Sequence, residues 1–326
     1  MSKAADLART ASASETALSN RNVVINGDYT ISQRGTSFTQ ADTYSLDRWR
    51  LNQSGETMSV SQQGFTAGQT DVPRAKHYLR VIITTTGNNA GITQRVEGVN
   101  NLSGQLVTLS FYARGGQGGQ AVPTTFRTYL NQNFGSGGST AVNVQGSTNH
   151  GLTSSWQFFT ATVTLGSTSG KTVGTSPFTE IVFQQTTAEA CDFDIALVQL
   201  EVGTVATPFE HRSYGQELAL CQRYFQKLFN NVTSEHVSSG FSASTTKSIT
   251  TLVFNRMRAI PTVATTTPTL FTTIDGITHD SSATAFLNIG GNSVRIDSTT
   301  TGLTAKSGAL VRTLASCDGI TFDAEL

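Results

Sequence analysis

The residues that could bind a ligand lie on a predicted strand that starts at Phe126. Alternation along a strand places Phe126 and Leu130 on one face and Arg127, Tyr129 and Asn131 on the other. Guanidinium, amide and hydroxyl groups hydrogen-bond to sugar hydroxyls, and an aromatic ring has an apolar face on which a pyranose can stack. The sequence therefore predicts glycan binding at Arg127, Tyr129 and Asn131, with an ordinary polar sheet face as the alternative.

Two carboxylates, Asp192 and Asp194, are separated by one residue on another predicted strand and therefore share a face. Paired carboxylates can serve glycoside hydrolysis or bind calcium. Because Cys191, Phe193 and Ile195 must face the core, we expect the two acids on a solvated sheet face. A structural Ca²⁺ is the alternative, and catalysis is favoured less than either.

Other catalytic or metal-binding patterns are missing from the sequence. The five histidines show no HxH or HExxH spacing, and the serines form no GxSxG elbow. The three cysteines, Cys191, Cys221 and Cys317, are odd in number, far apart and without a CxxC pair, which argues against a disulfide framework or a zinc site. We therefore expect a protein that is not an enzyme and has no cofactor.

The charge composition restricts the partners. Only 13% of the 326 residues are charged, and 22 Lys and Arg balance 22 Asp and Glu. A neutral chain has no basic footprint for nucleic acid. No segment approaches the roughly 20 apolar residues of a membrane span, and Asp6, Arg9 and Glu15 interrupt any signal-like run. We expect no nucleic acid, no membrane insertion, and synthesis and folding in a cytoplasm.

Residues 22–212 are predicted to form a jelly-roll sandwich. Val, Ile, Leu and Phe recur at period two, and Gly, Asn and Ser clusters separate the segments, which is typical of short strands in a two-sheet fold. The clearest candidate strands are 104–113, 158–165, 179–184 and 191–200. On the last of these, we expect Leu197 on the same side as Cys191, Phe193 and Ile195.

Three further segments flank this predicted sandwich. Residues 1–21 are predicted to be a short helix for docking or trimerisation, or a frayed arm. Residues 213–229 are predicted to be a connecting helix, because Ser213 and Gln216 form a capping box before an apolar stripe. Residues 230–326 are predicted to be a small β tip domain whose thin core neighbouring subunits complete.

Several motifs resemble those of tailed-bacteriophage tail fibres and receptor-binding virion proteins. They are INGDYTISQRGTSF within 22–38, YSLDRWR at 44–50, QLEVGTVATPFEHR with LALCQRYF within 198–225, MRAIPTV at 257–263 and the terminal DAEL. The resemblance follows the chain in order over nearly its whole length. It implies a homotrimeric fibre protein that docks on the phage tail through its N-terminal segment, carries a carbohydrate-binding-module-like jelly roll and recognises a host surface polysaccharide.

The resemblance also implies structural roles and a location. Asp47, Arg48 and Trp49 would tie strands together through a buried ion pair beside an indole. The helix that carries Cys221, Arg223 and Tyr224 would pack trimer subunits together. The protein would be made in the host cytoplasm and belong to the virion. The alternatives are a structural capsid- or tail-decorating protein and a depolymerase tailspike, the latter disfavoured by the lack of clustered acids.

Overall fold

A computed structural model describes residues 20–39, 43–53, 55–85, 90–229, 235–265, 270–274, 277–280, 283–313 and 319–326. The chain divides into two compact units: unit 1 is Met1–Glu217 with Leu326, and unit 2 is Leu218–Glu325. The regular structure of the described residues is antiparallel β-strand, apart from one helix, α2. This confirms the predicted all-β class. The predicted N-terminal helix lies outside the described residues except for its last two positions.

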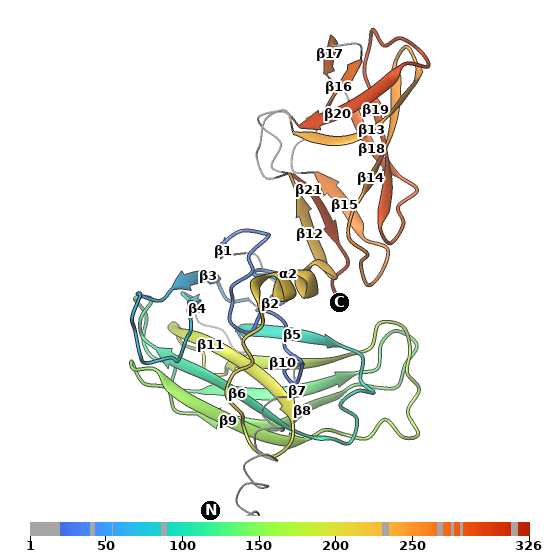
Figure 1. Ribbon diagram of the computed structural model, residues 1–326. Helices are drawn as coiled ribbons and strands as arrows, with labels where there is room; N and C mark the ends of the chain where they lie inside the picture. The colour runs from blue at the N-terminus through green and yellow to red at the C-terminus, as the bar shows by residue number, and fades with distance from the viewer. Residues whose placement is uncertain are drawn as a thin grey trace, which may run out of the picture. The chain divides into compact units, whose positions relative to one another are not determined.

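Unit 1 is a two-sheet sandwich (Figure 1). The six-stranded sheet has the order β1 (Ser37–Phe38), β3 (Met58–Gly64), β4 (His77–Ile83), β11 (Cys191–Val202), β6 (Leu106–Gly115), β9 (Gln157–Thr164). The five-stranded sheet has the order β2 (Trp49–Asn52), β5 (Gly91–Glu97), β10 (Phe178–Gln185), β7 (Phe126–Asn133), β8 (Val142–His150). Because the chain crosses repeatedly between the two sheets from β4 to β11, the predicted jelly-roll sandwich is confirmed.

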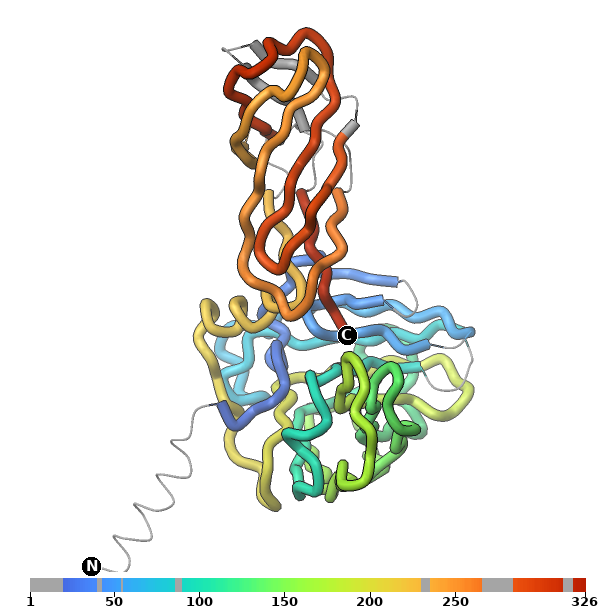
Figure 2. Tube along the Cα trace, turned by 90° about the vertical axis from the view of Figure 1, so that its right-hand side faces the viewer, coloured from blue at the N-terminus to red at the C-terminus, as the bar shows by residue number. Residues whose placement is uncertain are grey.

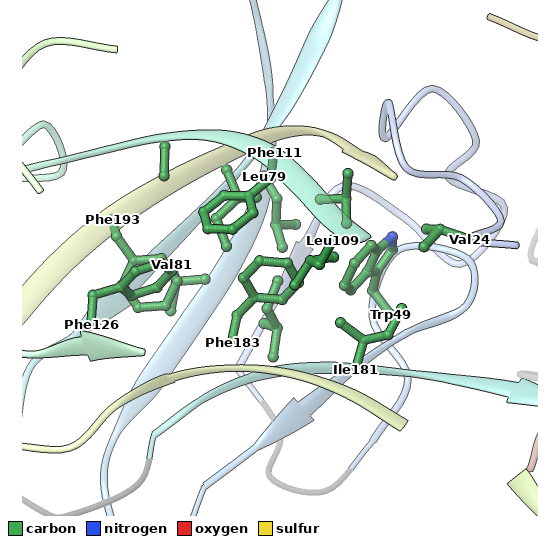
Figure 3. Close-up of a cluster of buried hydrophobic side chains, with 14 of the residues drawn as sticks. Val24, Trp49, Leu79, Val81, Leu109, Phe111, Phe126, Ile181, Phe183 and Phe193 are labelled. Atoms are coloured by element: carbon green, nitrogen blue, oxygen red, sulfur yellow. The ribbon is translucent and has the colours of Figure 1, made fainter. Parts of the chain in front are cut away.

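Aromatic rings from both sheets fill the core of unit 1 (Figure 3). Phe111 of the six-stranded sheet meets Phe183 of the five-stranded sheet edge to face, with ring centroids 5.0 Å apart. Phe126 and Phe193 also pair between the sheets, with tilted rings whose centroids are 4.9 Å apart. Trp49 is fully buried beside Phe183, at 6.1 Å. Such pairs add to the free energy gained from apolar burial.

A β-bulge in β11 changes which residues face the core. Between Ala196 and Gln199, three steps along β11 oppose two steps along β6. Leu197 lies at the bulge with a φ of 49°. It packs with Ala196 in a cluster apart from the main core, whereas Val198 faces the core. The prediction that Leu197 shares a side with Cys191 is therefore wrong, because one inserted residue reverses the alternation.

The predicted connecting helix is shorter than 213–229. Helix α2 spans Tyr214–Gln222. The predicted capping box is confirmed, because Ser213 accepts a hydrogen bond from the Gln216 amide while the Gln216 side chain accepts one from the Ser213 amide. The residues after the helix form β12 (Phe225–Leu228), which pairs with a strand of unit 2. That strand pairing overrides the helical spacing of Phe225 and Leu228.

Unit 2 contains a three-stranded and a seven-stranded sheet. The three-stranded sheet has the order β12, β21 (Ile320–Asp323), β15 (Thr262–Thr265). The seven-stranded sheet has the order β17 (Ile277–Asp280), β16 (Leu270–Ile274), β20 (Gly308–Thr313), β13 (His236–Ser244), β14 (Lys247–Val253), β19 (Ser293–Thr299), β18 (Ala283–Leu287). Figure 2 shows its orange and red strands running side by side. The described core is small, and Phe254 and Phe322 stack at its centre, 4.2 Å apart.

Candidate functional site

The predicted ligand-binding residues lie together on the outer face of the five-stranded sheet. Along β7, Phe126 and Leu130 are buried in the core, whereas Arg127, Tyr129 and Asn131 alternate with them and are half-buried. The predicted division of this strand into an apolar and a polar face is therefore confirmed. Its cause is local, since alternation alone sends these side chains outward.

The neighbouring strand β10 holds these side chains in place. Gln184 lies opposite Arg127 and accepts a hydrogen bond from its Nη2, at 2.9 Å. Glu180 lies opposite Asn131 and accepts from its Nδ2, at 3.1 Å. The Arg127 guanidinium lies 5.0 Å from the centre of the Tyr129 ring. We call Arg127, Tyr129, Asn131, Glu180 and Gln184 the Arg127 row.

The Arg127 row contains a positive and a negative side chain, and it has both hydrogen-bond donors and hydrogen-bond acceptors. Arg95 of β5 pairs with Glu180 at 3.1 Å and closes one end of the row. Burial raises the pKa of Tyr129, and the positive charge of Arg127 opposes that shift only in part. The phenol therefore stays neutral and can donate or accept a hydrogen bond. Side chains fixed by one another lose little conformational freedom when a ligand binds.

Asp192 and Asp194 are both fully buried, so the expected solvated face is wrong. Asp194 accepts from Nε of Arg80 at 2.8 Å and from Nε of Arg114 at 2.9 Å. Asp192 accepts from the backbone N–H groups of Gln117 and Gln120, at 2.6 and 2.8 Å. The surroundings of Asp194 are cationic, which is the opposite of what Ca²⁺ requires.

Among the described residues, no group of three or more His, Cys, Asp and Glu side chains could hold a metal ion. Within the same ranges, no helix is long and apolar enough to cross a membrane.

The Asp47, Arg48 and Trp49 motif ties strands together through hydrogen bonds. Asp47 accepts hydrogen bonds from the backbone and side chain of Gln33, and the Arg48 guanidinium donates to a backbone carbonyl on β5. The Asp47 carboxylate is thus bonded to Gln33, and a buried ion pair within the motif stays a prediction. Burial raises the pKa of Asp47. Asn26 joins the motif, since its carbonyl accepts from the Trp49 indole at 2.9 Å and its amide donates to the Asp47 carbonyl at 3.0 Å.

Cys221, Arg223 and Tyr224 lie where helix α2 gives way to β12, in unit 2. Cys221 and Tyr224 are buried, and the Tyr224 amide donates to the Cys221 carbonyl at 2.9 Å. The Tyr224 carbonyl accepts from Ala324, and the Arg223 carbonyl from Arg258. These backbone hydrogen bonds join the residues after helix α2 to two later segments of unit 2, at Arg258 and Ala324. A further role in trimer packing stays a prediction.

A cleft of about 420 Å³ on the outer face of the six-stranded sheet was not predicted. Its lining includes Arg74, Tyr112, Phe158, Leu197, Phe209 and His211. Phe209 and His211 belong to the PFEHR part of the motif that follows β11, which was considered above only for its resemblance to phage fibre proteins. Leu197 reaches this face because of the bulge in β11, and period-two alternation alone gives no sign of a bulge.

No protein-family model matches the chain, and no curated protein matches it. Solved structures match over little more than half of it. The enzymatically active domain of tailspike protein 4 of bacteriophage CBA120 is 17% identical, with a TM-score of 0.38 over 56% of this chain and 22% of that chain. A CBM4 structure is 18% identical, with a TM-score of 0.33 over 55% of this chain and 98% of that chain.

A cyclase from Fischerella sp. TAU is 14% identical, with a TM-score of 0.39 over 57% of this chain and 99% of that chain. The chain thus spans most of two of these structures and about a fifth of the tailspike domain's chain. At such low identities and TM-scores, binding modules and enzymes match about equally well. These matches therefore carry no functional assignment.

Proposed function

We propose that unit 1 binds a glycan through the Arg127 row and that the protein is a non-enzymatic receptor-binding protein of a phage tail. The observation that carries the proposal is the row itself. Arg127 and Tyr129 present a guanidinium and an aromatic ring side by side, and Gln184 and Glu180 hold their neighbours in fixed positions. Planar polar groups beside a ring suit the hydroxyls and the apolar face of a pyranose.

The tail assignment rests on the sequence motifs that resemble phage fibre proteins. The non-enzymatic assignment is supported by the acids that sequence reasoning selected, because Asp192 and Asp194 are engaged by backbone amides and by Arg80 and Arg114. Three sugar sites on one trimer would raise the apparent affinity by roughly 10²–10⁴ over a single weak site.

Titration of the full chain with a panel of neutral glucose, galactose, mannose and xylose oligosaccharides tests the site. We expect binding to at least one, weakened about tenfold by Tyr129→Ala or Arg127→Ala, which corresponds to about 1.4 kcal/mol. Lys171→Ala is the matched control, since it removes one exposed charge from a loop outside the row. Unchanged affinity in both row variants would overturn the proposal.

Two further measurements test the biological assignment. Light scattering should give a mass near three times 34.7 kDa for a homotrimer, and a stable monomer would contradict it. Virions that carry Tyr129→Ala should lose adsorption while keeping their integrity. Normal adsorption with fragile particles would instead identify a structural decoration protein.

A further inference from the structure

The outer face of the six-stranded sheet carries its own apolar cluster, formed by Val72, Tyr78, Ala196 and Leu197. The rings of Tyr112 and Phe209 pack against it, and both also line the cleft. The cleft is therefore built into a packed surface and is not a gap between loose loops. Its volume of about 420 Å³ lies in the range of small-ligand sites.

An exposed ring forms part of the cleft wall. Phe158 of β9 pairs with Tyr112 of β6 across the sheet, and their ring centroids are 5.0 Å apart. Half of the Phe158 side chain is exposed, at 50%. Leaving this apolar area in water forgoes about 25 cal/mol per Å², which a ligand that covers the ring would recover.

The opposite wall is fixed before any ligand binds. Glu201 accepts hydrogen bonds from both the amide and the hydroxyl of Thr207, at 2.8 and 2.7 Å. Gln199 donates to the Thr207 carbonyl at 3.2 Å and accepts from the Glu210 amide at 2.8 Å. Both acceptor residues follow the bulge in β11. The loop that carries Phe209 therefore pays little ordering entropy on binding.

Positive charge gathers at one end of the cleft. Arg74 lines both this cleft and a neighbouring depression, which Lys76 also lines. His211 lines both as well, but burial and the charge of Arg74 lower its pKa, so the positive charge comes from Arg74 and Lys76. The side chains of Arg74 and Lys76 are exposed and make no hydrogen bond or ion pair within the described part of the chain. The depression also contains acids, but Glu217 already pairs with Arg212 at 3.4 Å. The remaining acid, Asp28, can balance only one of the two positive charges of Arg74 and Lys76, so the depression keeps an excess of positive charge.

We infer that this cleft is a second sugar site, which binds a pyranose bearing an anionic group. The sugar ring lies on Phe158 and Tyr112, and the carboxylate or phosphate lies against Arg74, with Lys76 within the same depression. The choice of a sugar rests on the glycan binding proposed above. The cleft itself shares no residue with the Arg127 row.

Calorimetric titration of the full chain tests this inference with galacturonic acid oligosaccharides, galactose 6-phosphate and neutral galactose oligosaccharides. We expect at least one acidic probe to bind. Phe158→Ala should weaken that binding about tenfold because it removes the apolar stacking face, and Arg74→Gln should weaken it about tenfold because it removes one charge-assisted contact. Arg74→Lys should retain most of it, and Lys171→Ala should change nothing.

Comparison of the two acidic probes shows whether the anionic group is a carboxylate or a phosphate. The affinity for the probe whose anionic group contacts Arg74 should fall in Arg74→Gln. Failure of both acidic probes to bind, or unchanged affinity in Phe158→Ala and Arg74→Gln, would overturn the inference. Loss in Tyr129→Ala alone would place the acidic sugar on the Arg127 row and also overturn it. If the wild-type protein binds an acidic probe but none of the neutral oligosaccharides, the proposed row is contradicted and the inference about the cleft stands.

Discussion

Glu201 and Thr207 form a two-pronged clamp, in which one carboxylate accepts from the amide and the hydroxyl of the same residue, at 2.8 and 2.7 Å. The clamp joins the end of β11 to the loop that carries Phe209. Glu201 is nearly fully buried and also accepts from Gln199 at 2.8 Å. Together with Gln199, Glu201 thus holds this wall of the cleft in position.

Glu201→Gln should loosen that wall, because an amide cannot accept all three of these bonds. We expect a loss of roughly 1–3 kcal/mol in the free energy of unfolding and weaker binding of the acidic probes. Glu189→Gln is the matched control. Glu189 clamps the amide and hydroxyl of Thr124 in the same way, but it does not line the cleft. Equal loss of probe binding in both variants would contradict a specific role for Glu201.

Asp194→Asn should strongly destabilise unit 1, because it leaves the Arg80 and Arg114 guanidinium groups without their buried counter-charge. We expect a loss of about 3 kcal/mol. Urea unfolding followed by tryptophan fluorescence measures it, since the two tryptophans both lie in unit 1.

Glu180→Gln is the comparison for this prediction. Its ion pair with Arg95 is more exposed than that of Asp194, with side-chain exposures of 14% and 22% for Glu180 and Arg95. It should therefore cost less than about 1 kcal/mol. A similar small loss in both variants would show that the buried arginine pair does not stabilise the sheet.

The contribution of His150 to the stability of unit 1 should fall as the pH drops from about 6.5 to about 4. Burial against Phe111 and Phe159 lowers the pKa of His150 from 6.5 to about 4. Unfolded chains therefore take up a proton in this range while folded chains do not. The loss reaches at most about 3 kcal/mol and is absent above pH 6.5, where both forms are neutral.

His150→Gln removes this titration and can keep a hydrogen bond to Thr128, whose Oγ1 lies 2.9 Å from Nε2 of His150. Chemical unfolding of both proteins at several pH values tests the assignment. The stability difference between wild type and variant should shrink toward pH 4. A constant difference from pH 7 to pH 4 would show that His150 does not titrate as predicted.

Gly27→Ala should destabilise unit 1 by more than about 2 kcal/mol. A Cβ atom at Gly27 would lie 2.1 Å from the carbonyl oxygen of Val198, while the Gly27 carbonyl accepts from the Val198 amide at 2.8 Å. Gly151→Ala is the control, because its added Cβ meets nothing within 4 Å. Thermal denaturation of both variants tests this prediction. Equal melting temperatures would contradict the close approach of Gly27 to the Val198 carbonyl.

Residues whose partners are local were predicted correctly. The alternation of β7 placed Arg127 and Tyr129 outward, and Ser213 formed its capping box with Gln216. The spacing of these residues along the chain carries the information. The same reasoning located four strands of the sandwich, β6, β9, β10 and β11.

The environments of residues whose partners are distant in sequence were not predicted correctly. The environment of Asp194 depends on Arg80 and Arg114, which lie 114 and 80 residues away. Strand β13 has no strong local signal, because its sequence, HVSSGFSAS, has few apolar residues, and pairing with β14 and β20 determines its position. The cleft was missed because the bulge that turns Leu197 outward has no signature in hydrophobic periodicity.

The bulge in β11 also bears on how such a protein can diversify. Deletion of one codon there would restore regular alternation with β6, return Leu197 to the inner face and remove part of the cleft floor. The residues before the bulge, which face Phe126 and its neighbours, would keep their register. Insertion or loss of a single residue can therefore create or abolish a ligand site on the outer surface while most of the inner core stays unchanged.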